Sequence, residues 1–524
     1  MLEKEKTYLY LLFLVLSGYY LLAFPWQLSA SDTIFYLMSA REFSEGQFWG
    51  GVNSYWGTLI SLLMVPLMWL GLKGLWAFKV AQILIGLVGV GQVWRLMGHF
   101  ELQKPVAFWA QVTCIVLLWM MTMSHTPDLL MVVLLLGYFN ETLKPESSSA
   151  LKVGIIGGLL FLCKGYGFPF FLAHFSLWTI YQRLTVKNQE QKSLQIKFFL
   201  TGMVAFLVIA GSWVSILSVK YDHFTLGSSG SYNMAYMGPF MQFNPPYFDR
   251  LHNPETKFTN YFIGEEQGLF ADYGKWQPFG SKSGLQYMMT RVFANASKLY
   301  YITYLRDLVF LLIMIGGFSW FFKMKLPEKD RQLAISILIF LGVYNAGYFV
   351  LFPNERYLWI NHILLTIAFF WMLGRLWRTE RSSRLVKLML IPVIIIFGIN
   401  IIDRIQFRTQ ENDFHTALQA AKSDIRALQL EGKSVVSNIK PVPSAIPDYM
   451  DPTCLLMYEN RFKIWGFIRT KKLHSGIIDE ITRADIDHFL LWGNHADSSP
   501  FTDYVLLYAN ADIGLRIYDL QNAE

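Results

Sequence analysis

The chain has 524 residues, of which 53% are hydrophobic and only 16% are charged, whereas soluble proteins carry about 25% charged residues. Mean hydropathy is +0.33. These values exclude a disordered chain, a secreted disulfide scaffold and an ordinary cytosolic enzyme. The 42 Phe, 27 Tyr and 17 Trp residues are typical of helices that face lipid and carry aromatic belts at the membrane interfaces. We therefore expect a multi-pass membrane protein.

The formal charge is unevenly distributed along the chain. The net charge is +7, but the part from Asp403 onward has 13 basic and 17 acidic residues, so it contributes −4 and the remainder +11. A basic membrane portion is typical of cytoplasmic loops rather than of nucleic-acid binding. Cys114 and Cys163 lie in apolar segments and Cys454 is alone in the acidic tail, so no disulfide framework is indicated.

Apolar runs in chain order predict about eleven membrane-spanning helices, since a span needs roughly 17–25 residues. The first run lacks a cleavage site after a short apolar region, so we interpret it as a retained span. The run 58–72 is short and contains Pro66, which favours a helix lying in the interface. The expected spans lie near 7–25, 75–97, 106–123, 128–143, 151–164, 166–182, 198–219, 305–323, 332–351, 357–374 and 386–402.

The basic loops predict the orientation. If 58–72 does not cross and the N-terminus is cytoplasmic, every basic loop falls on the cytoplasmic side, as the positive-inside rule requires. If it crosses, all of them move outside. We therefore expect a transmembrane unit, 1–402, with outer loops at about 26–74 and 220–304, and an extracytoplasmic α/β domain, 403–524. The basic clusters are Arg95/Lys104, Lys144/Lys152, Arg183/Lys187/Lys192/Lys197, Lys323/Lys325/Lys329/Arg331 and Arg375/Arg378/Arg381/Arg384/Lys387.

The tail alternates helix-like and strand-like patterns. Residues 415–430 are amphipathic, 434–437 and 504–508 are strand-like, and 489–492 follow an acidic turn, which together predict a small α/β domain. No internal repeat is visible in the chain, and this disfavours a transporter built on inverted repeats.

Two acidic residues stand at expected helix starts on the outer face. Asp32 follows the first span, and Asp128 follows Thr126 and Pro127 at the start of another. Helix capping explains both equally well, because an acidic residue there satisfies free N–H groups and the helix dipole. The two interpretations are compatible, since a capping carboxylate can also act as a base.

Two cationic residues are candidates on the same face. Lys164 lies between two apolar runs. A lysine at membrane depth costs free energy, so one that is present there is a functional candidate. The alternative is that its side chain snorkels to the interface. Arg356 begins a span next to Glu355, and the alternative there is an interfacial ion pair beside an aromatic anchor. The outer loop 220–304 is rich in aromatic, Asn, Gly and Pro residues, which suits carbohydrate stacking or an ordinary lid. The chain has no HExxH, CxxC or Walker-type motif, so metal clusters and nucleotide cradles are unsupported.

These motifs in this order resemble the GT-C superfamily of membrane glycosyltransferases, in particular the branch of protein O-mannosyltransferases and the lipid A aminoarabinose transferase. The resemblance spans the whole plan of the chain. It rests first on the acidic motif after span one (Asp32, Tyr36, Ala40 and Gly46) and on the aromatic turn 53–56 with the interfacial helix that follows. It continues with the Thr-Pro-Asp motif at Asp128, the Lys-Gly turn at Lys164, Glu-Arg-Tyr at 355–357 and the outer tail. One departure is Tyr55-Trp56-Gly57-Thr58 where some relatives have Lys-Pro-Pro, so a phosphate contact there must come from Lys73, Lys164 or Arg356.

The resemblance implies an inverting transfer of a hexosyl or pentosyl group from a polyprenyl-phosphate carrier to a lipid, glycan or protein acceptor on the outer face. It implies no certain cofactor, leaves a divalent metal open, and places the protein among membrane lipids, in a bacterial inner (plasma) membrane with the site facing the periplasm or exterior. The implied roles are general base for Asp32, second acidic residue for Asp128, donor-phosphate binding for Arg356, Lys164 and Tyr357, and substrate binding for Tyr36, Tyr55, His125 and Glu355.

Physical chemistry is consistent with such a reaction. A hydroxyl is a poor nucleophile, so a carboxylate base would assist it, while a cation would stabilise the phosphate leaving group. The competing class is a membrane transporter or flippase of a lipid-linked or charged substrate, whose site should lie near the midplane and be reachable from both sides. A polysaccharide polymerase or ligase is a third, chemically closer alternative.

Overall fold

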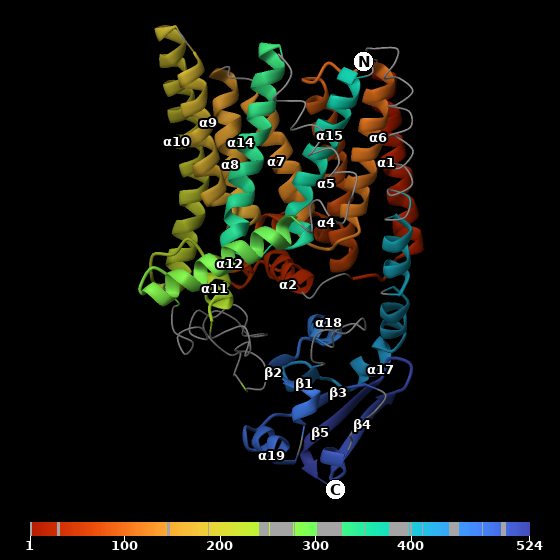
Figure 1. Cartoon of the computed structure of the whole chain (residues 1–524). Coiled ribbons are helices and arrows are strands. Elements are labelled where there is room, and N and C mark those ends of the chain that lie inside the picture. Colours follow the sequence, from red (N-terminus) through yellow and green to blue (C-terminus); the bar gives the residue numbers. More distant parts are fainter. Residues whose placement is uncertain are drawn as a thin grey trace.

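The structure is a computed structural model (Figure 1). It describes residues 3–28, 32–143, 147–186, 188–239, 278–300, 327–351, 353–376, 401–410, 412–439, 450–473, 475–493 and 499–523, with the single residues 251, 276 and 398. The expected span 305–323 lies outside the described residues, and so does nearly all of 386–402.

Long helices run side by side and form the larger part of the molecule (Figure 1). Within the described residues, six helical segments are long and apolar enough to cross a membrane, so the chain is an integral multi-pass membrane protein. The expected number of eleven spans stays a prediction. The long helices are α1 (Glu3–Ala23), α5 (Gly74–Met97), α6 (Lys104–Thr122), α7 (Asp128–Thr142), α8 (Ser147–Cys163), α9 (Gly167–Thr185), α10 (Gln189–Tyr221), α14 (Glu328–Val350) and α15 (Trp359–Leu376).

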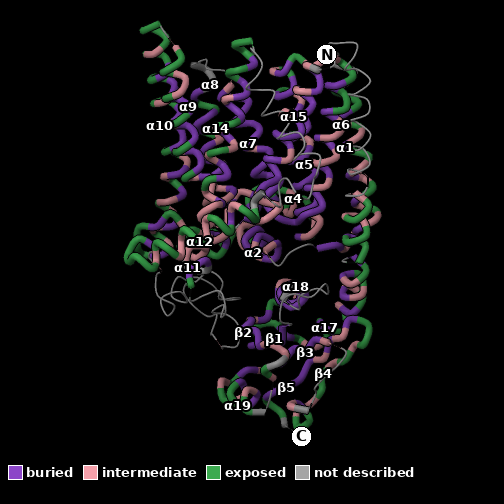
Figure 2. Tube along the Cα trace, in the orientation of Figure 1, coloured by how far each residue is buried: buried purple, intermediate pink, exposed green. Residues whose placement is uncertain are grey.

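The helices differ in how much of their surface other helices cover. In α1 and α10, apolar side chains such as Leu11, Val15, Leu200 and Val208 are 51–70% exposed, and Figure 2 shows green stretches along both helices. These surfaces suit lipid. The interior is tightly packed instead: a Cβ added to Gly154 of α8 would lie 2.1 Å from the carbonyl oxygen of Gly202 in α10. Small residues at that crossing allow the two backbones to approach closely.

Short helices gather at one end of the bundle, opposite the N-terminus (Figure 1). The helix in the ambiguous run 58–72 has 11 residues with Pro66 inside, which gives a length of about 16 Å and agrees with the expectation that it does not cross. The short elements are α2 (Asp32–Ser44), α3 (Phe48–Gly51), α4 (Leu59–Trp69), α11 (Ser229–Met237) and the 3₁₀ turn η4 (Glu355–Leu358). The 19-residue helix α12 (Lys282–Tyr300) lies at the same end of the bundle (Figure 1).

The C-terminal part contains a five-stranded sheet in the order β2-β1-β3-β5-β4. β1 is parallel to β2 and β3, while β5 is antiparallel to β3 and β4. The strand predictions at 434–437 and 504–508 are confirmed by β1 and β4, and residues 489–492 lie in β3. The boundary at 402/403 stays a prediction. The elements are α17 (Lys422–Ala427), β1 (Ser434–Ile439), α18 (Met450–Asn460), β2 (Lys463–Arg469), α19 (Ser475–Arg483), β3 (His488–Trp492), β4 (Tyr504–Asn510) and β5 (Leu515–Ala523).

The sheet part contacts the bundle through α18 and α2. A guanidinium N–H of Arg41 donates to the backbone oxygen of Tyr458 at 2.7 Å, and the guanidinium carbon lies 4.7 Å from the centre of the Tyr458 ring. The Tyr458 hydroxyl also fills the space beside Gly74, where an added Cβ would lie 2.2 Å from it. The helix that begins at Asp32 is therefore held at its other end by the C-terminal part.

Candidate active site

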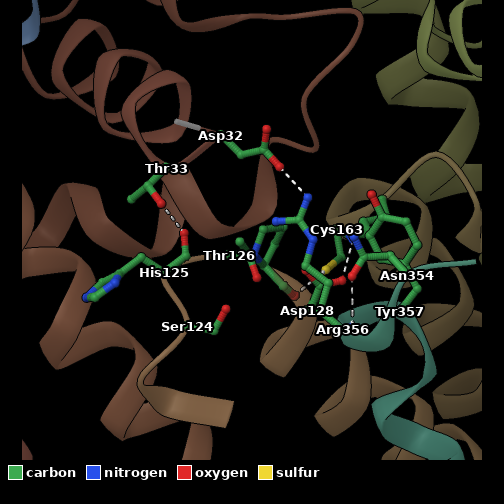
Figure 3. Close-up of polar contacts among 12 residues, drawn as sticks. Asp32, Thr33, Ser124, His125, Thr126, Asp128, Cys163, Asn354, Arg356 and Tyr357 are labelled. Atoms are coloured by element: carbon green, nitrogen blue, oxygen red, sulfur yellow. Dashed lines mark hydrogen bonds and ion pairs between the residues drawn. The ribbon is translucent and has the colours of Figure 1, made fainter. Parts of the chain in front are cut away.

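Four charged side chains from separate segments meet in one cavity. Asp32 is the first residue of α2, Asp128 is the first residue of α7, Lys164 directly follows α8, and Arg356 lies in η4. Three of them are drawn with labels in Figure 3. The cavity has a volume of about 210 Å³, and it is lined by these four and by Tyr36, Tyr55, Trp56, Gly57, Pro127, Gly165, Tyr166, Ser229, Asn233, Tyr348, Leu351 and Tyr357.

The four charges form two linked ion pairs. Arg356 Nη2 donates to Asp32 Oδ2 at 2.5 Å, and Lys164 Nζ forms an ion pair with Asp128 Oδ1. Arg356 also faces the second carboxylate, with 3.7 Å between its Nε and Asp128 Oδ2. The Asp128 side chain is only 3% exposed, so its charge has to be compensated by such partners.

Two buried polar atoms of this network face each other without a hydrogen bond. Within the part of the chain that the structure describes, neither Asp128 Oδ2 nor Arg356 Nε has a hydrogen-bond partner, although buried polar groups in proteins almost always have one. Both residues line the cavity. Charge attraction rather than a hydrogen bond therefore holds the guanidinium next to Asp128.

An aromatic ring confines both cations. Lys164 Nζ lies 4.2 Å from the centre of the Tyr357 ring and Arg356 Cζ lies 5.3 Å from it. On that ring stacks Tyr348, at 5.6 Å between centroids and an angle of 21°. The backbone N–H of Arg356 donates to the Asn354 side chain at 3.3 Å, which caps η4. The cations therefore have a fixed direction rather than the freedom of surface side chains.

Hydrogen bonds also fix the two carboxylates relative to each other. The hydroxyl of Thr33, next to Asp32, donates to the backbone oxygen of His125 (Figure 3). Gln82 of α5 donates to the backbone oxygen of Thr126 at 2.7 Å, in the turn before Asp128. The α7 helix begins at Asp128, with Pro127 in the capping position. Both carboxylates thus lie at helix N-termini, where the dipole favours a negative charge.

The structure brings most of the expected site residues to the cavity. Tyr36, Tyr55 and Tyr357 line it together with the four charged residues, and burial raises the pKa of Tyr36 well above its ordinary value, with Asp32 and Asp128 adding to the effect. Tyr36 is therefore a neutral hydrogen-bonding group at neutral pH.

His125, Glu355 and Lys73 are not brought to the cavity. The His125 ring is buried, with its Nε2 2.8 Å from the Tyr20 hydroxyl, because its backbone rather than its side chain faces α2. Glu355 is paired with Arg404 at 3.4 Å, and Lys73 is the residue before α5. A motif places neighbouring residues on different sides of the chain, which explains why sequence proximity alone did not distinguish them.

Several cavity residues were not singled out from the sequence. Trp56, Tyr166, Tyr348, Ser229 and Asn233 line the cavity. Tyr166 follows the Lys-Gly turn and Trp56 belongs to the aromatic turn, so both were close to motifs. Tyr348 lies at the end of a span, where an aromatic residue reads as an interface anchor.

Neighbouring carboxylates are common ligands of divalent cations. No three His, Cys, Asp or Glu side chains in the described part of the chain come together as ligands. Asp32 and Asp128 are each paired with a cationic side chain through one oxygen, Asp32 Oδ2 with Arg356 and Asp128 Oδ1 with Lys164.

Comparison with known proteins gives structural matches only. No protein-family model matches the chain, and no curated protein matches it. ArnT from Cupriavidus metallidurans in the apo state is similar at 11% identity, with a TM-score of 0.48 and 97% of each chain covered. An oligosaccharyltransferase from Archaeoglobus fulgidus in the apo form is similar at 9% identity and a TM-score of 0.51, covering 93% of this chain and 69% of that one.

Further structures of the same archaeal protein match as well. One, tethered to an acceptor peptide with the NVT sequon, has a TM-score of 0.53 at 9% identity, with 93% of this chain and 68% of that chain covered. Another is a complex with Zn and sulfate. At 9% identity the archaeal structures, with TM-scores of 0.51 and 0.53, show that this chain shares their fold.

Proposed function

We propose that the protein is a glycosyltransferase that moves a sugar from a polyprenyl-phosphate carrier to an acceptor hydroxyl at the outer face of the membrane. One observation carries the proposal: two carboxylates and two cations from four segments converge in a single cavity at one end of the bundle. Such a group supplies a base for the acceptor and cations for the phosphate. The GT-C fold, which also occurs in an oligosaccharyltransferase, supports the proposal.

The reaction is a single displacement. Asp32 accepts the proton of the acceptor hydroxyl, the oxygen forms a bond to the anomeric carbon, and the bond between that carbon and the phosphate oxygen breaks. The bonding electrons stay on the phosphate, which leaves as polyprenyl phosphate. Asp32 then gives the proton to that phosphate or to water. Attack opposite the leaving group inverts the anomeric centre, by analogy with single-step glycosidases.

The cations act on the phosphate. Arg356 lies just before α15 and Lys164 just after α8, both at the outer end of the bundle. A carrier phosphate stays at this depth while its prenyl chain remains in lipid. A guanidinium holds two phosphate oxygens in a fixed fork, whereas an ammonium acts as a point charge. In a site with little water, both stabilise the charge that grows on the leaving group.

Without a substrate, Arg356 neutralises the base. The 2.5 Å hydrogen bond from Arg356 to Asp32 Oδ2 occupies a lone pair that would otherwise take the acceptor proton. A carrier phosphate competes with Asp32 for the same guanidinium and so makes the carboxylate available. Donor binding thus prepares the base for the acceptor.

The sidedness of the protein follows from its helix ends. Arg95, Lys192 and Arg375 belong to ends opposite the cavity, so the positive-inside rule assigns them to the cytoplasm and the cavity to the outer side, as in a bacterial inner membrane with a periplasmic site. Labelling of Lys73→Cys and Lys192→Cys variants tests this: opposite sides of intact membranes should be labelled, and labelling from one side would overturn it. No observation favours the transporter or flippase, because the cavity is at helix ends rather than at the midplane.

A binding measurement tests the donor. We expect purified protein in lipid nanodiscs to bind polyprenyl phosphate, but not polyprenol of the same length, and the Arg356→Ala variant to lose this difference. Arg404→Ala, which removes a cation outside the cavity, is the matched control and should behave as the wild type. Equal binding of polyprenol and polyprenyl phosphate would overturn the proposed function.

A further inference from the structure

One wall of the cavity carries no charge. It consists of Tyr55 and Trp56, from the turn between α3 and α4, and of Ser229 and Asn233 of α11; we call these four residues the uncharged wall. The proposed reaction assigns no role to any of them, although the family resemblance implies that Tyr55 binds substrate. Their chemistry is that of aromatic rings next to a hydroxyl and an amide, and all four are half-buried.

The turn that carries the two aromatic residues is rigidly held. The Asn53 side chain accepts hydrogen bonds from the backbone N–H groups of Tyr55 at 2.7 Å and Trp56 at 2.9 Å. The backbone N–H of Ser54 donates to the hydroxyl of Tyr221 in α10 at 3.1 Å. The turn is therefore fixed before any ligand arrives, which reduces the entropy cost of binding.

The rings of the wall are also supported from behind. Trp56 stacks on Phe35 at 5.0 Å between centroids with an angle of 7°. Tyr55 meets Trp56 edge-on at 4.4 Å and Tyr232 edge-on at 5.0 Å. A fixed aromatic surface of this kind offers apolar area to the C–H face of a sugar ring while it keeps a polar tip for hydroxyls.

The α11 side of the wall supplies hydrogen-bonding groups. The Asn233 amide nitrogen donates to the backbone oxygen of Ser229 at 2.8 Å, which fixes the direction of the amide. Hydroxyls and amides both donate and accept, so they match the hydroxyl groups of a sugar. An ammonium or carboxylate on the ring would find no opposite charge on this wall, and a buried unpaired charge is costly.

The wall adjoins the turn that carries Lys164. A Cβ added to Gly165 would lie 2.7 Å from Ser229 Oγ, and one added to Gly57 would lie 1.9 Å from the backbone oxygen of Cys163. A sugar bonded directly to a phosphate at Lys164 and Arg356 therefore has its ring beside this wall. The cavity volume of about 210 Å³ is below the roughly 300–1,000 Å³ of sites for drug-sized ligands, so it suits one ring rather than an oligosaccharide.

We propose that the uncharged wall binds a single neutral sugar, the one that the carrier phosphate bears, and so selects what is transferred. The proposal rests on the proposed function and extends it to the class of donor sugar. Trp56 stacks on the ring, and Asn233 bonds its hydroxyls. Both are specificity-determining residues rather than proton-transfer groups.

Binding to protein in nanodiscs tests the proposal. The probes are undecaprenyl phosphate alone and the same lipid carrying glucose, galactose or mannose, an amino sugar, or a disaccharide of glucose. We expect at least one neutral monosaccharide lipid to bind about tenfold more tightly than the plain carrier, and more tightly than the lipids with the amino sugar and the disaccharide.

Variants assign that gain to the wall. Trp56→Ala and Asn233→Ala should lose the gain for the sugar, about tenfold and about three- to tenfold respectively, while plain carrier binds as in the wild type. Trp56→Phe should keep most of it. Trp49→Ala is the matched control, because Trp49 is 50% exposed and does not line the cavity.

The binding results distinguish failure of the proposed function from failure of the sugar assignment. If the plain carrier does not bind, the proposed function is wrong. If the carrier binds but no neutral sugar adds affinity, if Trp56→Ala and Asn233→Ala keep the gain, or if the amino sugar or the disaccharide binds as well as the best monosaccharide, the sugar assignment is wrong and the proposed function stands.

Discussion

Two paired carboxylates, Asp128 at the end of the bundle and Asp487 before β3, show how differently the two regions use a charge. Asp128 is 3% exposed, pairs with Lys164, and leaves one oxygen without a hydrogen bond among the described residues. Asp487 is 24% exposed, pairs with Lys433 at 3.0 Å, and accepts from the backbone N–H and the hydroxyl of Ser434.

The difference separates chemistry from stability. The Asp487 carboxylate accepts three hydrogen bonds, from Lys433 and Ser434 at the start of β1, and so joins β1 to the residue before β3. Its contacts serve the fold. The carboxylates at the cavity are paired with two cations, for which the carrier phosphate competes in the proposed function. Substitutions in the first region should therefore change stability, and substitutions in the second should change transfer.

The largest expected effect is at Asp32. Asp32→Asn keeps the size of the side chain and removes the proton acceptor, so transfer from a lipid-linked sugar should fall by about 10²–10⁴-fold while the protein still inserts and folds. The measurement is the rate of sugar transfer from the sugar lipid that binds best. The control is Glu45→Gln, at the residue directly after α2. Near-normal turnover of Asp32→Asn would reduce Asp32 to a helix cap. Asp128→Asn should also be severe.

The next effect is at Arg356. Loss of a charged hydrogen bond in a partly buried site costs roughly 1.5–3 kcal/mol, so Arg356→Ala should lower transfer about ten- to a hundredfold. The donor concentration for half-maximal rate should rise, and Arg356→Lys should restore the rate only in part because it lacks the planar fork. Rescue by more acceptor, or an unchanged donor dependence, would make Arg356 structural and leave Lys164 as the phosphate ligand.

The sequence predicted the parts of the site better than their connections. Asp32, Asp128, Lys164 and Arg356 could be selected because charges at expected helix ends are costly near a membrane. That Arg356 spans both carboxylates could not be predicted, since it depends on a separation of 324 residues between Arg356 and Asp32.

The C-terminal sheet was predicted in a similar way. Short strand patterns predicted two of its strands, β1 and β4, because alternation and β-branched residues are local signals. Its order β2-β1-β3-β5-β4 and the docking of α18 on α2 depend on tertiary packing, for which the sequence carries no local signal. Positions read from motifs failed for His125 because a motif does not tell which side of the backbone faces the cavity.

A smaller effect is expected where the two regions touch. Arg41 is 7% exposed and joins α2 to Tyr458, so Arg41→Ala should loosen the helix that carries Asp32 and lower transfer about three- to tenfold. Glu45→Ala breaks the neighbouring pair with Arg461, whose side chains are both 42% exposed, and should have little effect because exposed pairs contribute little. If both variants lowered transfer equally, the contact would be a general stabiliser of α2 rather than a positioning contact.

The smallest effect on transfer is expected at Asp487, where stability should change instead. Burial alone would raise the pKa of Asp487, but hydrogen bonds from the backbone and side chain of Ser434 and from Lys433 outweigh it and lower the pKa below its ordinary value. A carboxyl with a lowered folded pKa contributes stability above its unfolded pKa of about 3.9, and that contribution is lost as the pH falls through the folded value. The protection of the backbone amides of residues 434–439 against hydrogen exchange, measured relative to their intrinsic rates at each pH, should therefore fall below about pH 4 in the wild type of the full chain. The free energy of unfolding of Asp487→Asn should be about 1 kcal/mol lower at neutral pH, since the group is partly solvated. Its stability should depend less on acid than that of the wild type, while transfer stays within about twofold.

A variant at Asp487 that lost transfer but kept its exchange rates would mean that a carboxylate near the sheet serves the reaction, and the division between the two regions would be wrong.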